Sequence, residues 1–171
     1  MTWVDIIALG IIALSFFGGL REGAVKQFFK LLVLVIAIPL AGRSYWLVAT
    51  VLSFLPGEKW ENFIGFFITL GLISAILQLV SFLPRRIVQK IWRRGLVFRL
   101  LGGALGALNA SIGLVVFALV TLAYPLFDWL VRWVAGSSVL MSLMELFGFV
   151  QTMLPQVFQD AATLVTAGTL G

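Results

Sequence analysis

Side chains able to carry covalent or metal chemistry are few in this chain of 171 residues. There is no His and no Cys, which removes imidazole, thiolate and the usual zinc, copper and haem ligands. The seven Asp and Glu residues are scattered along the chain, so neither a nucleophile with its base nor a metal site can be assembled from them. We therefore expect no enzymatic activity, no cofactor and no bound metal.

Asp5 is the most unusual polar residue, because it stands at the start of a long apolar run. Asp, Ala, Ile, Ser and Gly occupy positions 5, 8, 12, 15 and 19, a mostly small or polar stripe at helical spacing that should face protein. Two interpretations of Asp5 stay open. It is either a water-exposed carboxylate at the headgroup level, favoured by a helix N-terminus, or a functional acid inside the membrane.

Gln78 is a second candidate polar residue. It shares one helical face with Gly71, Ser74 and Ser81. An amide in such a place can hydrogen-bond across a helix interface, which contributes on the order of 1 kcal/mol in membranes. We expect this structural role rather than a substrate site.

The elements that must position these residues are apolar helices. The chain is 61% hydrophobic and only 11% charged, far from a soluble domain. Its long apolar runs, at 3–20, 24–42, 62–83 and 100–123, are each about long enough to cross ~30 Å of hydrocarbon. We predict an all-α polytopic membrane protein whose residues 1–124 form a four-helix transmembrane domain, with Gly23 in the first turn and Pro39 bending the end of the second helix.

Small residues recur along one face of the fourth run. Gly102, Gly106, Asn109 and Gly113 step by four, three and four residues. Gly102 and Gly106 form the small-x-x-x-small pattern of close helix packing. We expect all four positions to contact a partner helix, which belongs either to this chain or to another one.

A basic block precedes this run. It is predicted to be a short amphipathic helix in the membrane interface that contacts anionic lipid headgroups, rather than a nucleic-acid site. Its cationic residues are Arg85, Arg86, Lys90, Arg93 and Arg94.

Residues 125–171 differ in character from the rest. They are predicted to form amphipathic helices on the membrane surface, with Ser137-Ser138 as a helix start. A fifth crossing by 139–154 is the alternative.

The distribution of Lys and Arg gives the orientation. Segments 21–30 and 84–99 hold three and six of them, whereas 43–61 holds two that Glu58 and Glu61 offset. The positive-inside rule therefore places the first two segments in the cytoplasm and both termini outside.

These features resemble the colicin V production protein (CvpA) family of bacterial inner-membrane proteins. The similarity covers about residues 2–124. It rests on a Trp-x-Asp start at Trp3, a Gly-Leu-x-x-Gly turn that ends at Gly23, and an Arg-x-Leu-Gly-x-x-x-Gly segment that begins at Arg99. The counterparts of family residues are Asp5, Gly23, Arg99, Gly102 and Gly106.

The chain departs from the family at three charges. Glu22 stands where members have Arg, Phe98 where they have Asp, and Asn109-Ala110 where they often have Arg-Gly. The resemblance implies a multi-pass protein of the inner (cytoplasmic) membrane, linked to colicin V production or export and to envelope maintenance. In a Gram-negative cell, the orientation given by the positive-inside rule places both termini in the periplasm.

Two functions remain open. The first is a non-enzymatic scaffold or accessory role, with membrane lipids, a homo-oligomer or other membrane proteins as partners and no nucleic acid. The alternative is an oligomeric small channel or transporter, whose polar path would use Asp5, Ser15, Gln78 and Asn109.

Overall fold

The computed structural model describes residues 2–52, 57–82, 95–154, 156 and 160. Every regular element in these residues is a helix, which confirms the all-α prediction. The helices are α1 (Trp3–Glu22), α2 (Ala24–Val51), α3 (Glu58–Val80), α5 (Leu96–Ala123), α6 (Asp128–Ala135), α7 (Ser138–Leu146) and α8 (Gly148–Met153). The predicted interfacial helix of the basic block falls in 83–94, outside the described residues.

The helices α1, α2, α3 and α5 are each long and apolar enough to cross a membrane, as predicted. The helix α2 extends beyond the predicted run of 24–42, because it continues through Pro39 to Val51. With 28 residues it is about 42 Å long. Helices that cross membranes tolerate an internal proline, since neighbouring groups satisfy the backbone that it frees.

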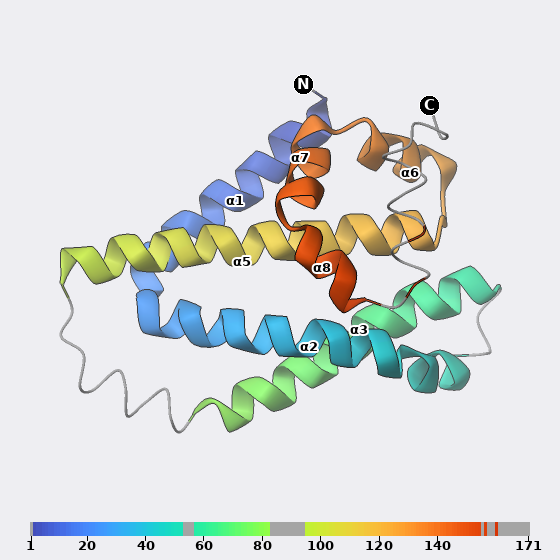
Figure 1. Ribbon diagram of the computed structural model, residues 1–171, viewed down its shortest axis with the longest axis horizontal. Helices are drawn as coiled ribbons and strands as arrows, with labels where there is room; N and C mark the ends of the chain where they lie inside the picture. Colours follow the sequence, from blue (N-terminus) through green and yellow to red (C-terminus); the bar gives the residue numbers. More distant parts are fainter. Residues whose placement is uncertain (1, 53–56, 83–94, 155, 157–159, 161–171) are drawn as a thin grey trace.

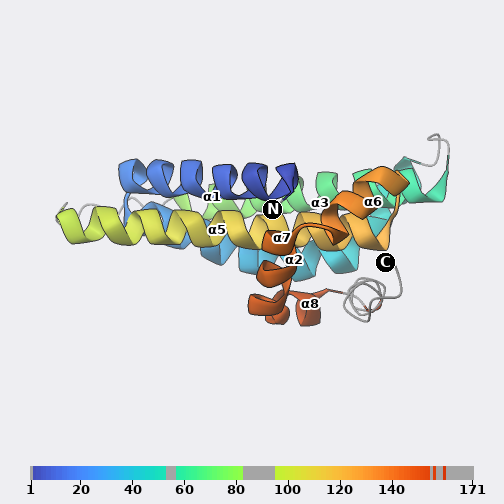
Figure 2. The same cartoon turned by 90° about the horizontal axis from the view of Figure 1, so that it is seen from above.

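The later helix α5 separates the consecutive helices α1 and α2. In Figure 1, α5 runs between them across the molecule, and α3 crosses α2, against which it packs. Figure 2 shows α1 on one side of α5 and α8 on the other. The helices α1 and α2 therefore meet mainly at their turn, where Gly23 has a φ of 83° that favours glycine.

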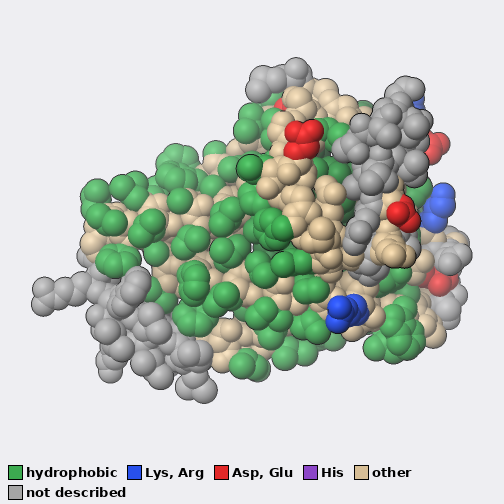
Figure 3. All heavy atoms as spheres, viewed as in Figure 1, with side chains coloured by type: hydrophobic (Ala, Val, Ile, Leu, Met, Phe, Trp, Pro, Cys, Tyr) green, Lys and Arg blue, Asp and Glu red, His purple; other side chains and the backbone are tan. Residues whose placement is uncertain are grey.

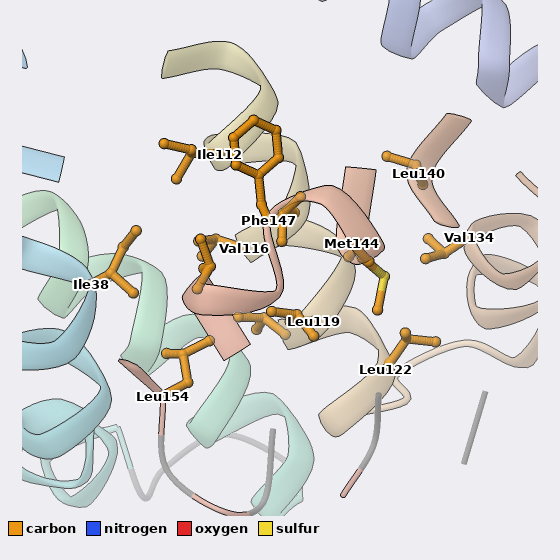
Figure 4. Close-up of a cluster of buried hydrophobic side chains, with 14 of the residues drawn as sticks. Ile38, Ile112, Val116, Leu119, Leu122, Val134, Leu140, Met144, Phe147 and Leu154 are labelled. Carbon is orange, nitrogen blue, oxygen red and sulfur yellow. The ribbon is translucent and has the colours of Figure 1, made fainter. Parts of the chain in front are cut away.

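The helices after residue 125 pack into the same core as α5 and are not confined to a surface layer. Figure 4 shows Met144 and Phe147 of the α7–α8 segment beside Val116 and Leu119 of α5, all buried. Neither α7 nor α8 is long enough to cross a bilayer, since the nine residues of α7 span about 13 Å. The described residues therefore give no fifth crossing.

The exterior of the bundle is apolar. On α1, Ile6, Leu14 and Phe17 are exposed, whereas Asp5 and Gly19 are buried, as the small-residue stripe predicts. In Figure 3, hydrophobic side chains cover much of the left and centre of the visible face. Such a surface suits lipid tails and the apolar faces of other membrane helices.

Candidate functional site

Asp5 connects the start of α1 to the start of α7. Its Oδ1 accepts hydrogen bonds from the Ser137 hydroxyl at 2.6 Å and from the Val139 backbone N–H at 3.1 Å. Its Oδ2 accepts from the Thr2 backbone N–H at 2.6 Å and from the Ser138 hydroxyl at 3.4 Å. The Ser137 hydroxyl oxygen in turn accepts from Leu140 N–H and caps α7, as the Ser-Ser pair predicts.

This geometry excludes one of the two interpretations of Asp5. The water-exposed interpretation is wrong, because the residue has no exposed surface and both carboxylate oxygens have donors. The carboxylate does stabilise the first turn of α1, as a helix-start acid should. Its donors come from the two chain segments that it joins, so it positions α7 on α1.

Gly102 and Gly106 lie where α5 crosses α1 at backbone contact. A Cβ on Gly102 would lie 2.5 Å from the Gly19 carbonyl oxygen, and one on Gly106 would overlap the Ser15 carbonyl oxygen. Only hydrogen fits at these positions. The partner helix is therefore α1 of the same chain.

Gly113 does not join this packing face, although its spacing predicts that it should. It is exposed, and a Cβ there would meet no atom within 4 Å. The physical reason is that α1 and α5 diverge beyond the crossing, with α7 in contact with both of them (Figure 1).

A charged and polar cluster lies on the other side of the crossing. Glu22 accepts hydrogen bonds at 2.6 Å from both Lys26 and Lys30, and at 3.0 Å from the Gln27 amide. Asn109 of α5 donates to the backbone oxygen of Gln27 at 3.1 Å and to its side-chain oxygen at 3.0 Å. We call Glu22, Lys26, Gln27, Lys30 and Asn109 the polar cluster. It joins α1, α2 and α5.

Sequence reasoning did not find the polar cluster. It used Lys26 and Lys30 as orientation charges of segment 21–30, whereas both form an ion pair with Glu22. The i,i+4 spacing of Glu22 and Lys26 was the available signal. That rule assumes one continuous helix, and Gly23 ends α1 between the two residues.

An open polar groove runs beside the cluster. One pocket, of about 310 Å³, is lined by Ser15, Glu22, Lys30 and Asn109 among others. A second pocket, of about 180 Å³, shares Lys30 and Asn109 and reaches Gln78 on α3. The two pockets together are called the polar groove below. The side-chain oxygen of Asn109 is buried there without a hydrogen-bond partner in the part of the chain that the structure describes.

The remaining predicted residues are dispersed. Gln78 is exposed and its side chain makes no hydrogen bond with another described residue, so the predicted bond across a helix interface is absent there. Arg99 is exposed on the first turns of α5 and shares a pocket with Arg21. The basic residues from Arg85 to Arg94 lie outside the described residues.

The chemistry available at these sites is that of hydrogen bonding and charge. Among the described residues, no three His, Cys, Asp or Glu lie together in a way that could hold a metal ion. The polar groove offers one carboxylate, one lysine ammonium group, two serine hydroxyls and amides, which suits small polar or charged species.

A comparison with protein families gives one match. The family model described as colicin V production protein matches residues 4–155. The curated proteins and the solved structures gave no significant match. The matched range includes Asp5, the glycine crossing, the polar cluster and all of α6 to α8.

Proposed function

The chain belongs to the colicin V production protein family, and from this premise we propose that it is a non-enzymatic accessory or scaffold protein of the bacterial inner membrane. Its role is to support colicin V production or export and envelope homeostasis. Its partners are membrane lipids and other membrane proteins, including further copies of itself.

The observation that carries this proposal is that polar groups inside the bundle hold its helices to one another. Asp5 holds α7 on α1, and Asn109 holds α5 on α2. Gly102 and Gly106 bring α5 into backbone contact with α1. These contacts join helices from both ends of the described chain into one unit with an apolar exterior. A membrane scaffold requires a rigid structure with an apolar outer surface.

A complementation experiment tests the scaffold role. The chain is expressed in a colicin V-producing strain that lacks its own copy, and secreted toxin is titrated on a sensitive lawn. We expect Gly102→Leu to abolish complementation, because a side chain there collides with Gly19 and Ala24. Gly113→Leu is the matched control and should complement fully, since its surroundings are open. Equal complementation by both variants, at equal membrane levels, would refute the scaffold argument.

The proposed orientation places the α1–α2 turn and the start of α5 in the cytoplasm and both termini in the periplasm. It is supported by the Lys and Arg residues of 21–30 and 84–99. Because the chain has no cysteine, single cysteines at Gly95, Lys59 and Thr152 report on it directly. An impermeant thiol reagent should label positions 59 and 152 in intact cells and spare position 95. Labelling of position 95 alone would reverse the orientation.

A small channel or transporter is the second candidate, and the polar groove favours it. The groove, rather than Asp5, would carry the solute, because Asp5 is enclosed by its donors while Lys30 and Asn109 line both pockets. Proteoliposomes that hold the purified chain should then show ion or solute flux that Asn109→Leu reduces. Asp128→Ala, at an exposed position on α6, is the control. Flux no higher than in empty liposomes would reject this function.

A further inference from the structure

A third pocket, separate from the polar groove, lies at the end of the bundle where α1 ends and α5 begins. It is open, has a volume of about 500 Å³ and is lined by Leu20, Arg21, Leu96, Arg99 and Leu100. It therefore combines two guanidinium groups with a wall of leucines. Neither the polar cluster nor the Asp5 contact includes any of these residues.

The glycine crossing explains why the two arginines line one pocket. Gly19 and Gly102 are in backbone contact, which fixes the last turn of α1 beside the first turns of α5. Arg21 follows Gly19 by two residues, and Arg99 precedes Gly102 by three. Residues that flank a fixed backbone contact so closely must lie at the same end of the bundle.

The two arginines have no acidic partner in the described residues. Both are exposed, and the ion pairs recorded there join Glu22 to Lys26 and Lys30. The adjoining segment 83–94 contains no acidic residue either. The first turn of α5 has no acidic residue and no side-chain cap, so its backbone N–H groups add to the positive potential. An anion is the complement of this surface.

The leucines indicate which anion it is. A small soluble anion gains nothing from an apolar wall, whereas a phospholipid has both a phosphodiester and acyl chains beside it. Guanidinium groups bind phosphate oxygens in a bidentate geometry. We propose that Arg21 and Arg99 form a binding site for the phosphate of an anionic phospholipid, with Leu20, Leu96 and Leu100 against its acyl chains. This site does not depend on the proposed role in toxin production.

Lipid titration of the purified full-length chain tests the proposal. Binding of phosphatidylglycerol, of phosphatidylcholine with the same acyl chains and of inorganic phosphate is followed by native mass spectrometry from a neutral detergent. We expect phosphatidylglycerol to bind most tightly. The double variant Arg21→Gln/Arg99→Gln should bind it about tenfold more weakly, because charge-assisted contacts to the phosphate are lost.

A matched variant separates a site from general charge. Arg43→Gln/Arg132→Gln removes the same charge from exposed arginines outside the pocket, and should change the affinity less than twofold. If both double variants lost affinity for phosphatidylglycerol equally, net charge alone would explain the effect and the proposal would be overturned. Inorganic phosphate binding as tightly as the lipid would overturn it in favour of a free-anion site.

Photolabelling of the unmodified chain keeps the test valid if the glutamine variant does not fold. Phosphatidylglycerol with a photoreactive acyl chain should label peptides that contain Leu20 or residues 96–100. Labelling confined to other helices would exclude the site.

Discussion

Replacement of Asp5 by alanine should release α7 from α1 while the remaining helices stay assembled. The change removes the acceptor of the Ser137 hydroxyl and of the Val139 N–H, at 2.6 and 3.1 Å. Both donors would then remain in a buried or half-buried place without a partner. A hydrogen bond to a charged acceptor is worth roughly a factor of ten in an equilibrium constant, so loss of the two should favour the released state about a hundredfold.

Amide hydrogen exchange in detergent micelles measures this release without any added label. Exchange in 138–146 reports the opening of α7, and exchange in α3 reports global unfolding. In Asp5→Ala, we expect exchange in 138–146 to accelerate about a hundredfold, with α3 unchanged. Asp5→Asn keeps one acceptor oxygen but places an amide N–H against Thr2 N–H, so its effect should be about tenfold.

Asp128→Ala is the control for this experiment, because it removes an exposed acid from a neighbouring short helix. It should leave exchange in 138–146 unaltered. Two results would refute the reasoning. One is an amide exchange rate of 138–146 in Asp5→Ala that stays within twofold of the rate in the unmodified chain. The other is equal acceleration in α3, which would mean that Asp5 supports the whole bundle and not the docking of α7.

The remaining predictions concern the crossing, the first turn and the polar cluster. Gly106→Ala should lower the stability of the bundle by about 2 kcal/mol, since the added methyl overpacks against the α1 backbone, whereas Gly113→Ala should not, and thermal unfolding in micelles compares them. Gly23→Ala should destabilise by about 1 kcal/mol, because its φ is 83°, while Gly10→Ala should stabilise α1 slightly in the same assay. Glu22→Gln should increase the rate at which an amine reagent modifies the two lysines that Glu22 holds, and equal rates in variant and unmodified chain would show that the ion pairs do not restrain them.

The sequence predicted the parts of the fold that depend on local pattern. Length and apolarity identify the four spans, and the spacing of Gly102 and Gly106 identifies the face that packs. Gly113 has the same spacing, but periodicity gives only a direction around one helix. How far a partner follows that face depends on the crossing of two helices, which is a tertiary property.

The contacts of the candidate sites could not be predicted from the sequence, for a different reason. Glu22 meets its lysines across a turn, and Asp5 meets Ser137 at a separation of 132 residues. The i,i+4 spacing of Glu22 and Lys26 is a signal only within one continuous helix, and Gly23 interrupts the helix there. The pairing of Asp5 with Ser137 leaves no periodic trace. Ser137 gave a signal by itself, as a helix start, but nothing in the sequence connected it with Asp5. The continuation of α2 through Pro39 reflects the membrane, where the alternatives to a helix are costlier than in water.

The position of α5 between α1 and α2 constrains how the chain assembles during synthesis. When α1 and α2 enter the membrane, the helix that will separate them has not yet been made. Until α5 inserts between them, α1 and α2 are therefore in the membrane while their small-residue faces lack the packing partner. The hydrogen bonds of Asp5 to 137–139 form later still, because these residues emerge from the ribosome after all four spans. The first helix of the protein is thus among the last to reach its final environment, and a chain cut short before α7 leaves Asp5 without its donors at 137–139, with only the Thr2 N–H remaining.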